Sequence, residues 1–121
     1  MYQVEILDQD KGIISLHWEG KVTPDEVDSA NEALKNAKTK INQPFDLLVL
    51  FNEGMVFLQE TQKKIVDHQK LLIDLGMKRA AVVTGNNSLI KMQLNRTAKQ
   101  SGNQVEFQFD TFEEALEFLS Q

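Results

Sequence analysis

The chain has 121 residues, of which 41% are hydrophobic and 26% are charged, and its formal net charge is −5 at pH 7; we expect one globular domain over residues 1–121. The absence of cysteine excludes disulfides, thiolate catalysis and cysteine metal sites, and the acidic balance argues against nucleic acid as a partner. No apolar stretch approaches the ~20 residues of a membrane span and the start lacks a signal-peptide pattern, so we expect a cytoplasmic protein without stable membrane insertion.

Strand-like apolar runs alternate with amphipathic, helix-like runs along the whole chain. Residues 2–8 and 14–19 alternate apolar and polar side chains on either side of the turn residues 10–12, which predicts a hairpin with one solvated face. The later elements are predicted as strands over residues 45–51, 79–84 and 105–110 and helices over residues 24–41, 59–75, 88–100 and 112–119.

Two helix starts carry clear capping signals. Thr23 precedes Glu26 by three residues, and Thr111 precedes Glu114 by three, so in each pair the two side chains are expected to bond each other's free backbone amide. The first helix also has Pro24 at a suitable position. Its predicted apolar stripe consists of Val27, Ala30, Leu34, Ala37 and Ile41.

The later elements differ in how strongly they are patterned. Residues 45–51 are nearly all apolar, which places this strand in the middle of the sheet, whereas residues 105–110 alternate as a sheet edge does. The second helix is expected to end at Gly76. Its predicted inward residues are Ile65, Val66, Leu72 and Ile73, and those of the third helix are Ile90, Leu94, Thr97 and Ala98.

These elements predict an α/β fold with a single sheet of five strands. The order is β-β-α-β-α-β-α-β-α, with the first strand antiparallel to the rest. Right-handed crossovers between neighbouring parallel strands would place the helices on the same side of the sheet. The other face would then be apolar along its two central strands, which predicts weak self-association as a homodimer through the central sheet face.

Charge is unevenly distributed along the chain. The net charge is −6 over residues 1–60, +6 over residues 61–104 and −5 over residues 105–121. The simpler interpretation is that solvated helix faces carry these charges, and that the acidic ends and the basic middle attract each other. The alternative is a positive surface over residues 61–104 for an anionic ligand or an acidic partner.

Three segments carry a resemblance to a known family. They are residues 19–26 (Glu-Gly-Lys-Val-Thr-Pro-Asp-Glu), residues 79–83 (Arg-Ala-Ala-Val-Val), and Phe109-Asp110 followed by residues 114–119 (Glu-Ala-Leu-Glu-Phe-Leu). With the order of elements, they resemble the anti-sigma-factor antagonist (STAS) fold, and especially its small SpoIIAA-like bacterial branch. The resemblance spans nearly the whole chain. It implies architecture without an established chemistry, and some relatives are grouped with lipid-carrier domains.

The resemblance also implies where a regulatory switch would lie. In the antagonist members, the loop after the third strand holds an aspartate and a serine or threonine that a partner kinase phosphorylates at the start of the next helix. Here the loop over residues 52–60 has no hydroxyl, and the first one is Thr61. We therefore expect no phosphorylation switch. Glu53 is a candidate mimic of phosphoserine, with about half its charge.

Residues with reactive chemistry are few. His17 and His68 have no metal-ligand spacing to each other or to a carboxylate pair and are expected at the surface, so no metal site, cofactor or enzyme activity is predicted. Residues 85–88 (Gly-Asn-Asn-Ser) follow a strand and open a helix. This pattern fits an anion site or an ordinary turn with a helix cap, and we favour the turn.

Residues 55–58 (Met-Val-Phe-Leu) are the most suggestive local feature. They follow a loop at the carboxyl end of a strand, where α/β proteins commonly bind ligands. They either fold back into the core or form an apolar lid or partner contact. In the second case, with Lys78, Arg79, Lys91 and Arg96 nearby, they would hold an amphiphile with an anionic head.

We therefore expect a noncatalytic regulatory or protein-interaction module whose partner is a protein. The alternative is a carrier or sensor of a small apolar or amphiphilic, lipid-like anionic ligand, which requires a cavity beneath residues 55–58. The candidate partner- or ligand-binding residues are Asn52, Glu53, Gly54, Met55, Phe57, Arg79, Thr84, Asn86 and Asn87.

Overall fold

The structure is a computed structural model that describes all residues from 1 to 121. It contains nine regular elements in the predicted order. The strands are β1 (Tyr2–Asp8), β2 (Ile13–Trp18), β3 (Phe45–Phe51), β4 (Met77–Val83) and β5 (Glu106–Phe109), and the helices are α1 (Pro24–Lys38), α2 (Gln59–Asp74), α3 (Ser88–Ser101) and α4 (Phe112–Leu119). α1 ends before the predicted residue 41, although Ile41 is still buried.

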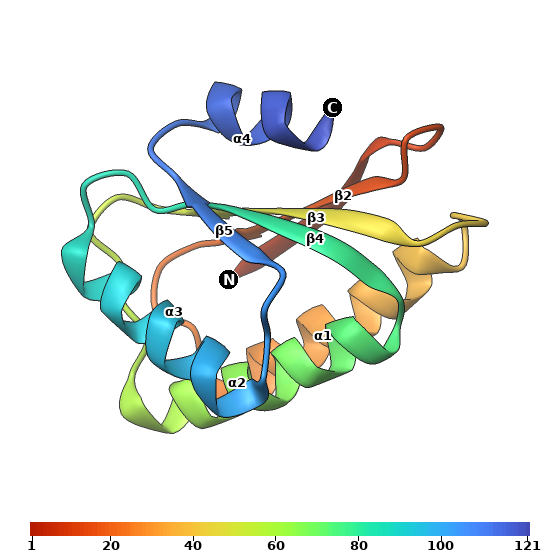
Figure 1. The fold of residues 1–121 in the computed structure, drawn as a ribbon. Helices are drawn as coiled ribbons and strands as arrows, with labels where there is room; N and C mark the ends of the chain where they lie inside the picture. The colour runs from red at the N-terminus through yellow and green to blue at the C-terminus, as the bar shows by residue number, and fades with distance from the viewer.

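The five strands form one sheet in the order β1-β2-β3-β4-β5 (Figure 1). β1 runs antiparallel to β2, whereas the pairs from β2 to β5 are parallel. The register places Leu16 beside Val49, and Val49 beside Val82. The predicted α/β class, the antiparallel first strand and the central position of β3 are confirmed.

The helices lie in two layers, one on each face of the sheet. α1, α2 and α3, which connect parallel strands, cover one face, while α4 lies across the other (Figure 1). The prediction that the helices share one side is therefore right for the three crossover helices and wrong for α4. The reason is connectivity, because α4 follows β5 and does not connect two parallel strands of this sheet, so the handedness rule for crossovers does not fix its side.

The main core lies between the sheet and the three crossover helices. The predicted stripe of α1 is buried, as are Ile90, Leu94 and Thr97 of α3. α2 differs from the prediction, because its inward positions include His68 and Gln69, while Ile73 is exposed. Residues 65, 68, 69 and 72 follow the helical spacing of three and four, which the predicted set did not. α2 ends at Asp74 with Leu75 as its C-cap, and Gly76 follows in the left-handed region as predicted, with a φ of +99°.

A second, smaller core lies under α4. Leu48 of β3 and Ala81 of β4 are fully buried there against Ala115 and Leu119. The two central strands are thus covered by the chain's own last helix. The expectation of an uncovered apolar face, and with it the basis for a homodimer through the central sheet face, is wrong, since α4 already buries that surface.

The two threonine caps form, but only in part. Thr23 and Thr111 accept hydrogen bonds from the backbone amides of Glu26 and Glu114, at 3.3 and 3.2 Å. Neither glutamate returns the bond to the threonine amide. Glu26 instead pairs with the N-terminal amine, which lowers the pKa of its carboxyl, and Glu114 accepts a bond from the Thr111 hydroxyl.

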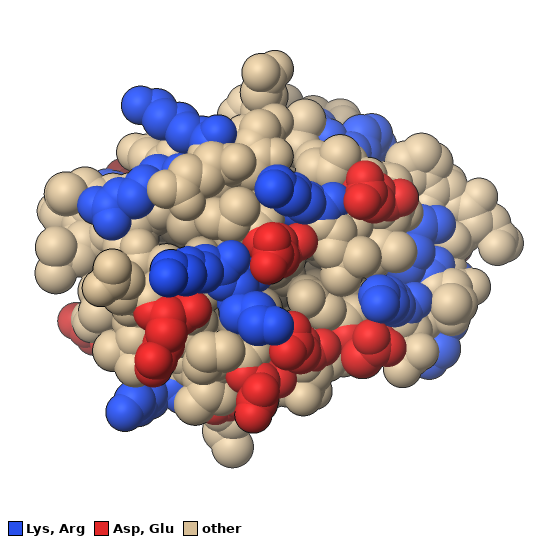
Figure 2. Space-filling model, turned by 90° about the horizontal axis from the view of Figure 1, so that it is seen from below, with Lys and Arg blue, Asp and Glu red and all other residues tan.

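Charges on the layer of crossover helices are mixed. Figure 2 shows this face with lysine and arginine side chains between aspartate and glutamate side chains. Lys64 of α2 pairs with Asp28 of α1 at 3.1 Å, which joins the basic middle of the chain to its acidic first part. This arrangement agrees with the interpretation of solvated helix faces. None of the helices combines the length and the apolar character needed to cross a bilayer.

Candidate functional site

A cleft of about 670 Å³ opens at the carboxyl edge of the sheet, where β3 and β4 end. One wall is the loop from β3 to α2, and the other is the loop from β4 to α3 together with the first turn of α3. We call this feature the loop cleft. Six of the predicted site residues line it, namely Asn52, Glu53, Gly54, Thr84, Asn86 and Asn87.

The first wall is a tight turn at the end of β3. Asn52 is held on both sides, because its side-chain oxygen bonds Nε2 of His17 at 2.9 Å and its amide donates to the carbonyl of Trp18. The amide of Met55 then donates back to the carbonyl of Asn52. Gly54, at a φ of +75°, supplies the left-handed backbone of this turn. Glu53 is exposed at the tip.

The apolar run after this turn divides between core and surface. Met55 and Phe57 are buried, and the Phe57 ring makes edge contacts with Trp18 and Phe51, at centroid distances of 6.0 and 5.8 Å. Val56 and Leu58 point the other way and are exposed. Both interpretations of residues 55–58 therefore apply, each to alternate residues.

Asn87 connects the two walls. Its side-chain oxygen accepts from the amide of Ile90 and caps α3, and its side-chain amide donates to the carbonyl of Met55 at 2.6 Å. Gln93, one turn further along α3, bonds both the amide and the carbonyl of Phe57. The first turns of α3 thus hold residues 55–57 in place.

Replacing Asn87 with alanine is expected to lower the free energy of unfolding by about 2 kcal/mol. The change removes the helix cap, worth about 1 kcal/mol, and leaves the carbonyl of Met55 without its donor. Urea denaturation measures this. Asn86→Ala is the matched control, since Asn86 is exposed and its side chain makes no hydrogen bond, and it should change stability by less than about 0.5 kcal/mol. Equal effects of the two changes would contradict the connecting role of Asn87.

Arg79 lies apart from the other predicted site residues. It is near the amino end of β4, where its guanidinium bonds the buried carboxylate of Asp46 at 3.2 and 2.8 Å. These hydrogen bonds hold the pKa of Arg79 above its usual value. Arg79 also donates to the carbonyls of Phe118 and Leu119 at the end of α4. The structure therefore places Arg79 in the packing of α4 and does not bring it to residues 55–58.

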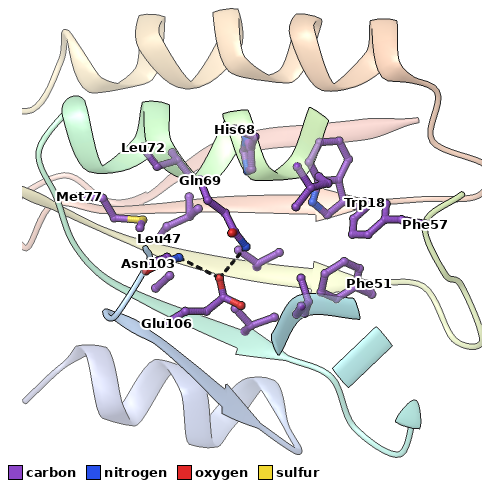
Figure 3. A pocket seen from close by; sticks show the side chains of 15 residues that line it. Trp18, Leu47, Phe51, Phe57, His68, Gln69, Leu72, Met77, Asn103 and Glu106 are labelled. Carbon is purple, nitrogen blue, oxygen red and sulfur yellow. Dashed lines mark hydrogen bonds between the residues drawn. The ribbon is translucent and has the colours of Figure 1, made fainter. Parts of the chain in front are cut away.

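A small cavity lies inside the molecule, between the sheet and the helices α2 and α3 (Figure 3). Apolar side chains form most of its wall, with Trp18, Phe51 and Phe57 at one end. Gln69, Asn103 and Glu106 form a polar group at the other end (Figure 3). The volume is about 30 Å³, which is the space of one water molecule. A lipid-like ligand would fit only if α2 or α3 moved away from the sheet.

Burial changes the pKa of two side chains that line this cavity. It raises the pKa of Glu106 to about 7 and lowers that of His68 to about 4, because a charged group loses its hydration in the interior. The amides of Gln69 and Asn103 both donate to Glu106 Oε2 at 3.1 Å. His68 bonds the side-chain oxygen of Asn31 and lies edge-on to Trp18.

The sequence reasoning missed these polar residues of the core. His68 was expected at the surface and is only 4% exposed, so that prediction is wrong. His68 and Gln69 lie three and four residues from the buried Ile65 and Leu72, and this helical spacing could have predicted their burial. Glu106 lies between Val105 and Phe107 in the sequence, and successive residues of a strand point to opposite faces of the sheet. In a short edge strand, the neighbouring sequence does not indicate which of these residues face the helices. Nowhere do three or more histidine, aspartate or glutamate side chains gather as metal ligands would.

Comparison with known proteins gives two matches. A family model described as SpoIIAA-like matches residues 13–120. Among solved structures, the chain is similar to the Bacillus cell fate determinant SpoIIAA in its phosphorylated form, with a TM-score of 0.60 and 14% identity over 98% of this chain and 99% of that chain. No curated protein sequence matches. The family match runs from β2 to the last turn of α4, and the chain therefore belongs to the SpoIIAA-like family.

Proposed function

We propose that this protein is a noncatalytic protein-interaction module of the bacterial cytoplasm, and that a partner protein docks on the loop cleft. The family and the shared fold support this proposal, since the similar solved structure is that of a cell fate determinant. The observation that carries it is the gathering of exposed apolar side chains around the loop cleft. Such clusters on a folded domain mark surfaces that bind other proteins.

Four of the eight large apolar side chains that are exposed lie in this region, namely Val56, Leu58, Leu89 and Met92. Val56 and Leu89 both line the loop cleft, each from one of its two walls. Met92 lies one turn after Leu89 on the same face of α3, next to the Gln93 that holds Phe57. Leu89 is 61% exposed, and this exposure has no role in the chain's own packing.

The module works without a phosphorylation switch in the loop after β3. Thr61, the first hydroxyl after this strand, is fully buried and donates to the carbonyl of Val22 at 2.8 Å. A kinase cannot reach such a group without unfolding the start of α2. Glu53, exposed at the tip of the loop, places an acidic side chain on this wall.

The test is affinity capture from an extract of the cell that makes the protein. Val56→Asp and Leu89→Asp place a charge on the proposed surface, and each is expected to reduce the recovered partner at least tenfold, as measured by quantitative mass spectrometry. Met55 is unsuitable for this purpose because it is buried. The recovered partner is then purified and titrated directly against the wild-type chain, which must reproduce the interaction.

Ile73→Asp is the matched control. Ile73 is 41% exposed on α2 and does not line the loop cleft, so this change adds the same charge to an apolar position elsewhere. It should leave the capture unchanged. The proposal fails if the same proteins are recovered in the same amounts with all three variants.

A further inference from the structure

β1 is an edge strand of the sheet, and its outer side is unpaired. Its one neighbour is β2, on the other side. The backbone nitrogens and carbonyls of Met1 and Glu19 bond each other in both directions, at 2.9 and 2.7 Å. Hydrogen-bonded and non-bonded residue pairs alternate along an antiparallel ladder, so Tyr2, Val4 and Ile6 direct their amides and carbonyls outward. These free groups are a template on which another strand can pair.

The side chains of this edge are also incompletely covered. Those of Tyr2, Val4 and Ile6 pack against the main core but stay half-buried. Beside them, a groove of about 350 Å³ lies between β1 and α1. Ala33 and Ala37 line its α1 wall, and such short side chains leave room for the apolar groups of a neighbouring strand. A second strand at this edge would therefore extend the ladder and complete the burial of this apolar row.

β1 is complementary to itself when two copies run antiparallel with Val4 opposite Val4. In this register Tyr2 lies opposite Ile6 of the second copy, and the outward backbone groups of each such pair exchange two hydrogen bonds. Gln3 then lies opposite Glu5. Apolar residues thus meet apolar residues on the face that the crossover helices cover, and a carboxylate meets an amide on the other face.

The registers centred one residue to either side are less favourable. Centring on Glu5 would place two Glu5 carboxylates directly opposite each other, and centring on Gln3 would place Met1 opposite Glu5. The register centred on Val4 instead places Met1 opposite Leu7. Both are apolar side chains that the single chain leaves exposed, at 67% and 38%. One register therefore satisfies the whole length of the strand.

From the free edge, the groove and the self-complementary register, we infer that two copies of this chain form a homodimer through β1. The two sheets join into one continuous sheet about a two-fold axis at Val4. This interface is distinct from the central sheet face, which α4 covers. Because β2 to β5 run in opposite directions in the two copies, the two loop clefts lie at opposite edges of the joined sheet, away from β1. The dimer is thus independent of the proposed docking function.

The first experiment measures the association of the purified chain by sedimentation velocity, from micromolar to millimolar concentration. The wild-type chain is expected to show a concentration-dependent equilibrium between monomer and dimer. Gln3→Glu places like charges opposite each other at two symmetric positions and should weaken the dimer about fivefold. Gln3→Lys places a cation opposite Glu5 and should strengthen the dimer by about the same factor. Gln3 is exposed, so both variants should keep the fold, which circular dichroism checks.

Gln104→Glu and Gln104→Lys are the matched controls for these charges. Gln104 is exposed and lies between α3 and β5, at the opposite edge of the sheet from β1. The same change in net charge at this position should leave the association unchanged. A chain that stays monomeric at millimolar concentration, or one that responds to the Gln104 variants as strongly as to the Gln3 variants, would overturn the inference.

The second experiment tests the register by disulfide trapping, which is specific because the chain has no cysteine of its own. Val4→Cys alone should form a covalent dimer under mild oxidation, since hydrogen-bonded opposite residues lie about 5.5 Å apart at Cα, a distance that a disulfide spans. Gln3→Cys and Glu5→Cys should link to each other when mixed, and each much more slowly alone. Ile73→Cys, exposed on α2, is the control for random collision. Rapid linking of Glu5→Cys to itself, or linking of Val4→Cys no faster than that of Ile73→Cys, would overturn the proposed pairing.

Discussion

Replacing Arg79 with methionine is expected to lower the free energy of unfolding by about 3 kcal/mol. Asp46 is almost fully buried, and Arg79 provides both hydrogen bonds to its carboxylate. Without the guanidinium, a negative charge remains in the interior with little compensation. The change also removes donors from the last carbonyls of α4 and the contact with the Phe118 ring, whose centroid lies 5.1 Å from the guanidinium carbon.

Urea denaturation measures this effect, and Lys78→Met is its matched control. Lys78 Nζ lies 4.0 Å from the same carboxylate, but its side chain is 54% exposed, so its loss should cost less than about 1 kcal/mol. The double variant Asp46→Leu with Arg79→Met should recover most of the stability, since it removes both charges together. An Arg79→Met variant no less stable than Lys78→Met would show that the buried pair does not fasten α4.

Replacing Glu106 or His68 is expected to make the free energy of unfolding depend on pH more strongly than it does in the wild-type chain, where the contributions of these two side chains oppose each other. The folded protein keeps the proton of Glu106 up to a pH of about 7, whereas the unfolded chain releases it near pH 4.5. Stability is therefore lost as the pH rises through this window. For His68 the sign is opposite, because the unfolded chain binds a proton near pH 6.5 and the folded protein does so only near pH 4.

Glu106 and His68 each change the free energy of unfolding by about 3 kcal/mol between the pKa of the unfolded chain and that of the folded protein. Between pH 4.5 and 6.5 they oppose each other at about 1.4 kcal/mol per pH unit, so their sum is nearly independent of pH. In Glu106→Gln, stability relative to wild type should rise by about 3 kcal/mol from pH 4.5 to 7.5. In His68→Gln, it should rise by about the same amount as the pH falls from 7 to 4.

Urea titrations at closely spaced pH values give these difference curves, in which the contributions of all other carboxylates cancel. Glutamine suits both positions, since it keeps hydrogen bonds available to Gln69 and Asn103 or to Asn31. Parallel curves for wild type and both variants would mean that neither side chain titrates as its burial requires.

The architecture followed from short-range patterns in the chain. Alternation at a spacing of two, stripes at three and four, and the cap at Thr23 are properties of neighbouring residues, so they predicted nine elements and their order. The position of β3 was also predictable, because only a strand covered on both faces reads as continuously apolar as residues 45–51. The parts of the candidate site on the two loops at the carboxyl edge of the sheet were predicted for the same reason.

Contacts between distant residues decided the rest. Arg79 and Asp46, 33 residues apart, become partners because β3 and β4 are neighbours in register. Because of this contact, Arg79 packs near α4 and is not part of the expected site. The burial of His68 and Glu106 likewise depends on how α2 and α3 sit on the sheet. Local sequence specifies which side chains share a face, whereas the free energy of burying a charge depends on what the rest of the chain brings against that face.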